Sequence, residues 1–177
     1  VNADVRGAAI GGNGQGWYGS DTDGSGRGTK NIEINGGTVN TQGRIGSAYG
    51  GGSAENIVIT GDAVVNANGG IGGGDKDEQT SITISGNAKV NATDNGRGDI
   101  DASLAVIGGG VGSSSKKSHA KVTIEGNAQV TAENYEYGGG AGIGGGANGT
   151  GEVIIGGKAQ GGPPAGSRPS PRSSRRP

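Results

Sequence analysis

Short runs in which apolar and polar residues alternate recur along this chain. In SITISGNAKVNA, residues 81–92, Ile82 and Ile84 fall on one side of an extended chain, and Val90 repeats the pattern with an alanine two places to either side. Alternation with a period of two is typical of a β-strand that buries one face. The Ser-Gly-Asn in the middle is typical of a tight turn, because glycine adopts positive φ at little cost.

The same two-strand phrase occurs five times. Its paired apolar residues are Ile32 and Ile34, Ile57 and Ile59, Ile82 and Ile84, Val122 and Ile124, and Val153 and Ile155. A second landmark, isoleucine followed by glycine, alternates with it and has its isoleucines at positions 10, 45, 71, 107 and 143. These isoleucines lie 35, 26, 36 and 36 residues apart, so the basic unit has about 26 residues and the longer units carry insertions.

A unit of three short strands and three corners predicts an all-β fold, a β-solenoid of about five coils with loop insertions. Each coil would cover the next, with strands about 4.8 Å apart. Three inward columns are predicted: Ile34, Ile59, Ile84, Ile124 and Ile155; Val39, Val65, Val90 and Val130; and Ile10, Ile45, Ile71, Ile107 and Ile143. An outward row of polar residues would consist of Asn40, Asn66, Asn91 and Thr131. The insertions are polar and glycine-rich and cover 13–30, 93–106, 111–119 and 133–142.

Two regions follow from the pattern. Residues 1–160 are expected to form the solenoid array, a fragment cut inside a coil at both ends, since Val1-Asn2-Ala3 matches the end of the repeated phrase. Gly161 stands where the next valine is expected, and 161–177 is rich in Pro, Arg and Ser. This tail is expected to be disordered. Whether it is a natural linker or a non-native tail, from a frameshift or a vector, stays open.

Composition narrows the possible partners. The chain has 44 glycines and no cysteine, methionine or phenylalanine, so disulfides and cysteine-ligated metals are excluded. The tail carries four arginines and no acid, which leaves 1–160 with eleven basic and sixteen acidic residues. A mildly acidic body disfavours nucleic acid as a partner. No apolar stretch is long enough for insertion into a membrane. The expected partners are instead a glycan or host surface and neighbouring coils of a longer parent array.

The segment GGGAGIGGGANGTGEVIIGG (138–157) resembles the glycine-rich repeats of large bacterial cell-surface or secreted proteins. In that family GAGIGGG phrases alternate with ITISGG-VTA phrases, and the resemblance covers about residues 1–160. It implies a right-handed parallel β-helix of the adhesin or carbohydrate-binding type, extracellular or on the bacterial cell surface. The resemblance assigns no catalytic residue, because such repeats are scaffolds.

The aromatic side chains give a candidate ligand-binding set. Trp17 and Tyr18 lie in the first insertion, and Tyr135 and Tyr137 lie in the last. Exposed aromatic rings suit stacking on sugars or on partner proteins. Folding back to cover the flanks of the coils is the other interpretation. The expected function is a structural and adhesive repeat segment that binds glycans through its insertions, with a passive spacer as the first alternative.

A second candidate set lies in the same insertion. Asp21, Asp23 and Ser25 match the first half of a calcium loop, in which oxygen donors alternate and a glycine follows. The second half does not match, because Ile32 stands where the loop needs a bidentate glutamate. Calcium as a cofactor and a plain polar loop tip therefore both stay open.

An enzyme is not expected, although a polysaccharide-active β-helix fragment remains the second alternative. The outward carboxylates Glu33 and Glu125 stand in different predicted rows, and His119 is the only histidine. Paired carboxylates are what glycoside hydrolysis normally needs. Ice binding is also not favoured, since the outward asparagine row is not a regular threonine array.

Overall fold

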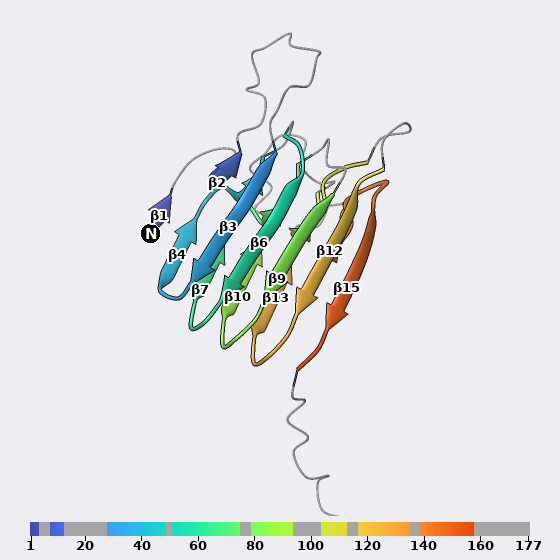
Figure 1. Cartoon of the computed structure of the whole chain (residues 1–177). Helices are drawn as coiled ribbons and strands as arrows, with labels where there is room; N and C mark the ends of the chain where they lie inside the picture. The colour runs from blue at the N-terminus through green and yellow to red at the C-terminus, as the bar shows by residue number, and fades with distance from the viewer. Residues whose placement is uncertain are drawn as a thin grey trace, which may run out of the picture.

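The computed structural model shows an all-β protein made of three parallel sheets with five strands each (Figure 1). It describes residues 1–3, 8–12, 28–48, 51–74, 79–93, 104–112, 117–134 and 139–157. Sheet A contains β1 (Asn2–Ala3), β4 (Thr38–Thr41), β7 (Val64–Ala67), β10 (Lys89–Thr93) and β13 (Gln129–Glu133). Sheet B contains β2 (Ala8–Gly12), β5 (Arg44–Ser47), β8 (Ile71–Gly72), β11 (Ile107–Gly108) and β14 (Ile143–Gly144). Sheet C contains β3 (Thr29–Asn35), β6 (Ala54–Thr60), β9 (Thr80–Ile84), β12 (His119–Ile124) and β15 (Thr150–Ile155).

The chain passes through sheets A, B and C in turn, five times. We number these passages coil 1 to coil 5, so that coil 1 contains β1, β2 and β3. Each strand pairs in parallel with the strand one coil away, and Figure 1 shows the strands of sheet C side by side, running from blue to red. The predicted all-β parallel architecture with about five coils agrees with this arrangement, which is that of a β-solenoid.

The register confirms all three predicted inward columns. In sheet C, Ile59 pairs with both Ile34 and Ile84, and Ile124 continues the column to Ile155. The valine column runs through sheet A and the Ile-Gly column through sheet B in the same way. A shift by one residue would turn every apolar side chain outward, and therefore burial fixes this register.

Burial of the columns depends on having a coil on each side. Ile45, Ile59 and Ile84 in the middle of the stack are completely buried, and each such side chain stabilises the fold by about 1.5–3 kcal/mol relative to exposure. At the far end Ile155 belongs to the same column as Ile84, yet it is 73% exposed, and Val153 is 40% exposed. Among the described strands, none pairs with the outer side of β15, and its apolar residues are exposed.

The three corners of a coil are built differently. The corner from sheet C to sheet A is short in all four places where it occurs between described strands, and it contains glycines with positive φ such as Gly61, Gly86 and Gly126. The other two corners, A to B and B to C, flank the narrow sheet B. The segments 4–7, 13–27, 49–50, 75–78, 94–103, 113–116 and 135–138, which join described strands but lie outside the described residues, all connect at these two corners.

One glycine column explains the recurring Ile-Gly phrase. Gly11, Gly46, Gly72, Gly108 and Gly144 are successive members of sheet B, and each has a φ between 124° and 143°. A Cβ atom on any of the first four would overlap the carbonyl oxygen of the glycine in the next coil. Only glycine allows both this backbone conformation and this close approach. The glycine runs are therefore places where coils touch through their backbones.

Arg44 is a feature that the alternation did not predict. It opens β5 and is only 5% exposed, the one charged side chain among the described residues that is buried. Its guanidinium donates to the carbonyl oxygens of Gly73 at 3.1 Å and Gly69 at 3.3 Å in coil 3, and to that of Ala105 at 2.9 Å in coil 4. Carbonyl partners offset the cost of burying the charge, so this side chain connects three coils.

Replacing Gly72 with alanine is expected to lower the free energy of unfolding by about 3 kcal/mol or more, because the methyl group meets the Gly108 carbonyl and φ is unfavourable. Denaturant unfolding followed by far-UV circular dichroism measures the loss. Gly142→Ala is the matched control, since its new Cβ would meet the Ala132 carbonyl oxygen at an ordinary 3.5 Å. Gly36→Ala isolates the cost of positive φ alone, since nothing lies within 4 Å. Equal losses in all three variants would contradict the backbone contact as the cause.

Candidate binding surface

The B-to-C corner is held by a buried threonine at its base. Thr29 begins β3 two residues after the end of segment 13–27. Its hydroxyl accepts a hydrogen bond from the N–H of Gly12, which directly precedes that segment. The same hydroxyl donates to the carbonyl of Gly46 at 2.9 Å, and the Thr29 N–H donates to the carbonyl of Ser53 at 2.8 Å. One side chain thereby fixes both ends of the insertion to each other and to coil 2.

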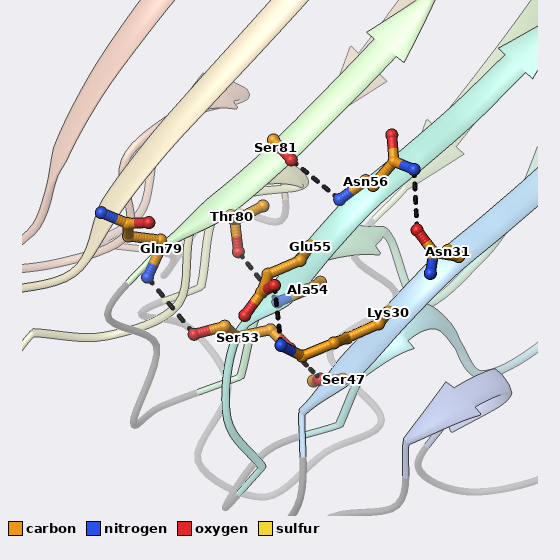
Figure 2. A network of polar contacts seen from close by, with 10 residues as sticks. All are labelled: Lys30, Asn31, Ser47, Ser53, Ala54, Glu55, Asn56, Gln79, Thr80 and Ser81. Atoms are coloured by element: carbon orange, nitrogen blue, oxygen red, sulfur yellow. Dashed lines mark hydrogen bonds and ion pairs between the residues drawn. The ribbon is translucent and has the colours of Figure 1, made fainter.

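The same corner carries a polar network on its outer side (Figure 2). Lys30 and Glu55 form an ion pair at 3.0 Å between coils 1 and 2. Beside it, the Asn56 side-chain amide donates to the Asn31 Oδ1 at 2.8 Å, and the Asn56 N–H donates to the Ser81 hydroxyl at 2.8 Å. Coils 1 to 3 are therefore joined through polar side chains where the B-to-C insertions depart.

Asn31 and Asn56 hold the backbone in the left-handed region, with φ values of 58° and 57°. Asparagine tolerates this conformation better than other residues with a side chain. In each case the bend adds one residue between the inward threonine or alanine and the first isoleucine of the strand. The sequence contains the signal, since an asparagine directly precedes the I-x-I phrase in the first two copies only, but the alternation pattern alone did not detect it.

The inner side of this corner is joined by hydroxyl groups in the next coils. The Ser47 hydroxyl donates to the Ser53 carbonyl at 3.0 Å, and the Ser53 hydroxyl accepts from the Gln79 N–H at 3.3 Å. The buried Thr80 hydroxyl accepts from the Ala54 N–H at 3.3 Å (Figure 2). Small hydroxylated side chains thus supply the hydrogen bonds that irregular backbone at a corner needs.

The A-to-B corner of coil 5 has its own anchor. The Asn134 side-chain amide, directly before segment 135–138, donates to the carbonyl of Gly140 at 2.8 Å. Gly140 in turn lies against the Leu104 carbonyl of coil 4, where a Cβ atom would overlap it. The two ends of this insertion are therefore hydrogen-bonded to each other and in close contact with coil 4.

The predicted ligand-binding residues Trp17, Tyr18, Tyr135 and Tyr137 lie outside the described residues, and so do the predicted calcium ligands Asp21, Asp23 and Ser25. What the structure does place is the anchor of each segment. Trp17 and Tyr18 belong to a segment rooted at the B-to-C corner of coil 1. Tyr135 and Tyr137 belong to one rooted at the A-to-B corner of coil 5. Four coil steps, about 19 Å, separate the two anchors along the stack, and both border sheet B.

The outer face of sheet A carries the predicted asparagine row, and the structure extends it by one member. The side-chain amides donate from coil to coil: Asn40 to Asn2 at 2.8 Å, Asn66 to Asn40 at 2.8 Å, and Asn91 to Asn66 at 3.0 Å. Thr131 occupies the next place in register. The face is thus a regular polar surface in which each amide already has one neighbour as its partner.

Two further rows flank this face. At the C-to-A corner, Asn127 donates to Asn87 at 3.0 Å, and Asn87 donates to Asp62 at 2.9 Å. On the opposite border, Asn68 donates to Gln42 at 3.1 Å. Hydrogen-bonded side-chain rows along a stack of parallel strands stabilise the stacking itself. The sequence predicted only the central row, because the corner residues differ in type from copy to copy.

Among the described residues, the side chains that could serve catalysis or metal binding are few and lie far apart. Glu33 and Glu125 stand in different rows, three coils and about 14 Å apart along the stack. The His119 Nδ1 lies 2.9 Å from the Thr150 hydroxyl, on an exposed surface. The described residues contain no group of three or more histidine, cysteine, aspartate or glutamate side chains that could hold a metal ion.

Comparison with known proteins gives no relative for this chain: no family model, no curated protein and no solved structure matches it. Within the described ranges, no helix is long and apolar enough to cross a membrane.

Replacing Thr29 with valine is expected to lower the free energy of unfolding by about 1–3 kcal/mol, because the shape is kept while the N–H of Gly12 and the carbonyl of Gly46 lose their buried partner. Hydrogen exchange measured by NMR should show faster exchange at Gly12 than in the wild type. Thr38→Val is the matched control, since Thr38 is exposed on the outer face of sheet A. Unchanged exchange at Gly12 would contradict the anchoring role of Thr29.

Proposed function

We propose that this chain is a structural and adhesive segment of a bacterial cell-surface or secreted protein, and that it binds glycans through the insertions beside sheet B. Its scaffold is a right-handed parallel β-helix. The observation that carries the proposal is the division of the coil into one short corner, described throughout, and two corners at which all the internal insertions connect. Such a division separates a continuous stack of strands from the loops that the stack carries.

The mechanical part of the proposal is supported by the continuity of the contacts along the stack. The backbone ladders of three sheets, the glycine column and the asparagine row all run in the same direction. Stability in such an array is approximately a sum of nearest-neighbour terms, so the segment resists bending and pulling through many equivalent contacts.

Handedness is supported by a general rule of chain topology. Parallel strands of one sheet that are joined by a crossover are right-handed in about 98% of cases. Every return to the same sheet here is a crossover of this kind, from β3 to β6 for example. The resemblance of the GAGIGGG and ITISG phrases to bacterial surface repeats supports the same hand, and it is also the basis for placing the protein outside the cell.

The adhesive part is supported by the position of the aromatic residues. All five aromatic side chains of the chain belong to segments that connect at the two corners beside sheet B. Aromatic rings offer the flat apolar surface on which sugar rings stack. The asparagine face is the less suitable binding surface, because its amides are engaged with one another.

A passive spacer is the second candidate function, and that same engagement favours it. Rows of side chains that satisfy one another stabilise a stalk without needing a ligand. The two functions differ in one respect only, which is whether the insertions bind anything.

Replacing Trp17 and Tyr18 with alanine, and separately Tyr135 and Tyr137, is expected to reduce glycan binding by about tenfold for whichever pair stacks on the sugar, because one aromatic contact contributes roughly 1–2 kcal/mol. Binding is measured on a glycan array and then by titration with the glycan that the array identifies. The matched control is Asn66→Ala on the outer face of sheet A, which should leave binding unchanged.

Binding that is equal in the wild type and both double variants would remove the aromatic residues from the proposal, and no binding to any glycan would leave the spacer. Incubation with polysaccharides, followed by size-exclusion chromatography, separately tests the polysaccharide-active alternative. Reproducible shortening of a polysaccharide would replace the adhesive function with an enzymatic one.

The half loop at Asp21, Asp23 and Ser25 is tested by thermal unfolding with calcium and with a chelator. A melting temperature that calcium raises in the wild type but not in Asp21→Asn would add a metal to the proposed binding surface. Identical melting temperatures in both proteins would remove calcium from it.

A further inference from the structure

Asn-Gly pairs occur at three places among the described residues: Asn35-Gly36, Asn68-Gly69 and Asn148-Gly149. An asparagine followed by glycine is open to an intramolecular reaction, because glycine has no Cβ atom to keep its backbone nitrogen away from the side-chain carboxamide of the asparagine. Whether the reaction takes place depends on what holds the carboxamide and what holds the nitrogen. The three pairs differ in both respects.

Asn68 is held at both ends of its carboxamide. Its Nδ2 donates to the Gln42 side-chain oxygen at 3.1 Å, and its Oδ1 accepts from the Thr93 hydroxyl at 3.3 Å. The following Gly69 lies against the backbone of coil 2, where a Cβ atom would stand 2.6 Å from the carbonyl carbon of Gly43. Asn68 must therefore break two hydrogen bonds, in a crowded place, before its side chain can turn toward the Gly69 nitrogen.

At Asn148 the backbone nitrogen is held instead. The N–H of Gly149 donates to the carbonyl oxygen of Gly146 at 3.0 Å. Gly149 also lies close to coil 4, since a Cβ atom on it would stand 3.2 Å from both the Cβ and the carbonyl oxygen of Ser118. The attacking atom of this pair is therefore engaged in the turn that precedes β15.

Neither restraint exists at Asn35, the last residue of β3. Among the described residues, none forms a hydrogen bond with its carboxamide or with the N–H of Gly36. The residue opposite Asn35 in coil 2 is Thr60, whose hydroxyl accepts instead from the Ser85 hydroxyl at 3.0 Å. Gly36 has a φ of 96°, and no atom lies within 4 Å of its Cβ position. Coil 2 therefore leaves both reacting groups free to move.

The carboxamide of Asn35 also lies on the same side of the corner as the Gly36 nitrogen. A Cβ atom placed on Gly61, at the corner after β6, would stand 2.5 Å from the Asn35 Oδ1 and 3.6 Å from the Gly36 nitrogen. Gly61 permits this close approach because it has no side chain of its own. The side chain of Asn35 and the peptide that follows it thus lean over the same glycine, which brings the two reacting groups toward each other.

We propose that Asn35 is a modification site, at which the chain deamidates without a partner enzyme. The Gly36 nitrogen forms a bond to the Asn35 Cγ, the bond from Cγ to Nδ2 breaks, and ammonia leaves with the proton of the Gly36 N–H. Water then opens the resulting cyclic succinimide at either of its carbonyl groups, which gives aspartate or isoaspartate. Water is the only co-reactant, and no electrons are transferred.

The products change the corner in two ways. Either one places a carboxylate on the outer face of sheet C, two residues from the exposed Glu33. Isoaspartate also adds a methylene group to the backbone of the short C-to-A corner that joins β3 to β4. This inference does not depend on a glycan ligand, because the insertions connect at the other two corners.

Peptide mapping by mass spectrometry tests the proposal, because trypsin places the three pairs in separate peptides, 31–44, 45–76 and 122–158. The full chain is incubated at mildly alkaline pH, where the backbone nitrogen loses its proton more readily, and is sampled over time. Asn35 is expected to convert about tenfold or more faster than Asn68, because Asn68 must first break two hydrogen bonds. It should also convert faster than Asn148. In urea that unfolds the chain, the three rates should converge.

Two glycine variants separate the reacting atom from the strain of the corner. Gly36 and Gly37 both have positive φ, and neither has an atom within 4 Å of its Cβ position. Gly36→Ala places a methyl group beside the attacking nitrogen and should slow the conversion of Asn35 severalfold. Gly37→Ala introduces the same kind of strain one residue later and should leave the rate unchanged. Asn35→Gln should abolish the mass change in peptide 31–44, because its longer side chain would have to form a larger ring.

Three results would overturn the proposal. A rate at Asn35 in the folded chain that is no higher than the rate at Asn68 would show that the corner protects Asn35. An order of rates that persists in urea would show that the fold does not cause the difference. Equal slowing by Gly36→Ala and Gly37→Ala would exclude the Gly36 nitrogen as the attacking atom. Circular dichroism of each variant confirms that the compared chains are folded.

Discussion

The close approach of glycine backbones in sheet B is the constraint on which the stack depends. Sheet B strands are as short as two residues, and yet they hold five coils in register because no side chain separates their backbones at the glycine column. Once these backbones are fixed, the isoleucine before each glycine must point inward and meet the isoleucines and valines of the other two sheets. The apolar columns then supply most of the stabilisation, while the glycines determine where those columns stand.

On the outer surface, polar side chains stabilise the contact between successive coils. Parallel strands bring identical positions next to each other, which would place like charges side by side if charged residues repeated. The chain instead repeats asparagine, which can donate to one neighbour and accept from the other. At two steps on the outer face of sheet C it pairs a lysine with a glutamate. Both solutions suit a stack, since these rows stabilise the contact between coils rather than opposing it.

The sequence predicted the stack more completely than the corners. Periodicity assigns Ile59 and Val65 correctly, because a residue that recurs once per coil on the same side of a strand must join a column. It could not reveal the buried Arg44, whose guanidinium is held by the carbonyls of Gly69, Gly73 and Ala105 in two other coils. Nor did it reveal the bend at Asn56, which depends on a backbone conformation rather than on apolarity. The candidate ligand residues, such as Trp17, stay predictions, since they lie outside the described residues.

The unequal corners have a consequence for how such a protein can change over time. Coil 2 and coil 3 are joined through the same short C-to-A turn as coil 4 and coil 5, although the segments beside sheet B range from two to fifteen residues. Residues can therefore be added to or removed from the insertions beside sheet B while the strand register of sheets A and C is unaffected. Mutations in the insertions can therefore change the exposed surface of the molecule without changing its fold. Duplication of one coil adds a further layer to the stack and, with it, a further position for an insertion.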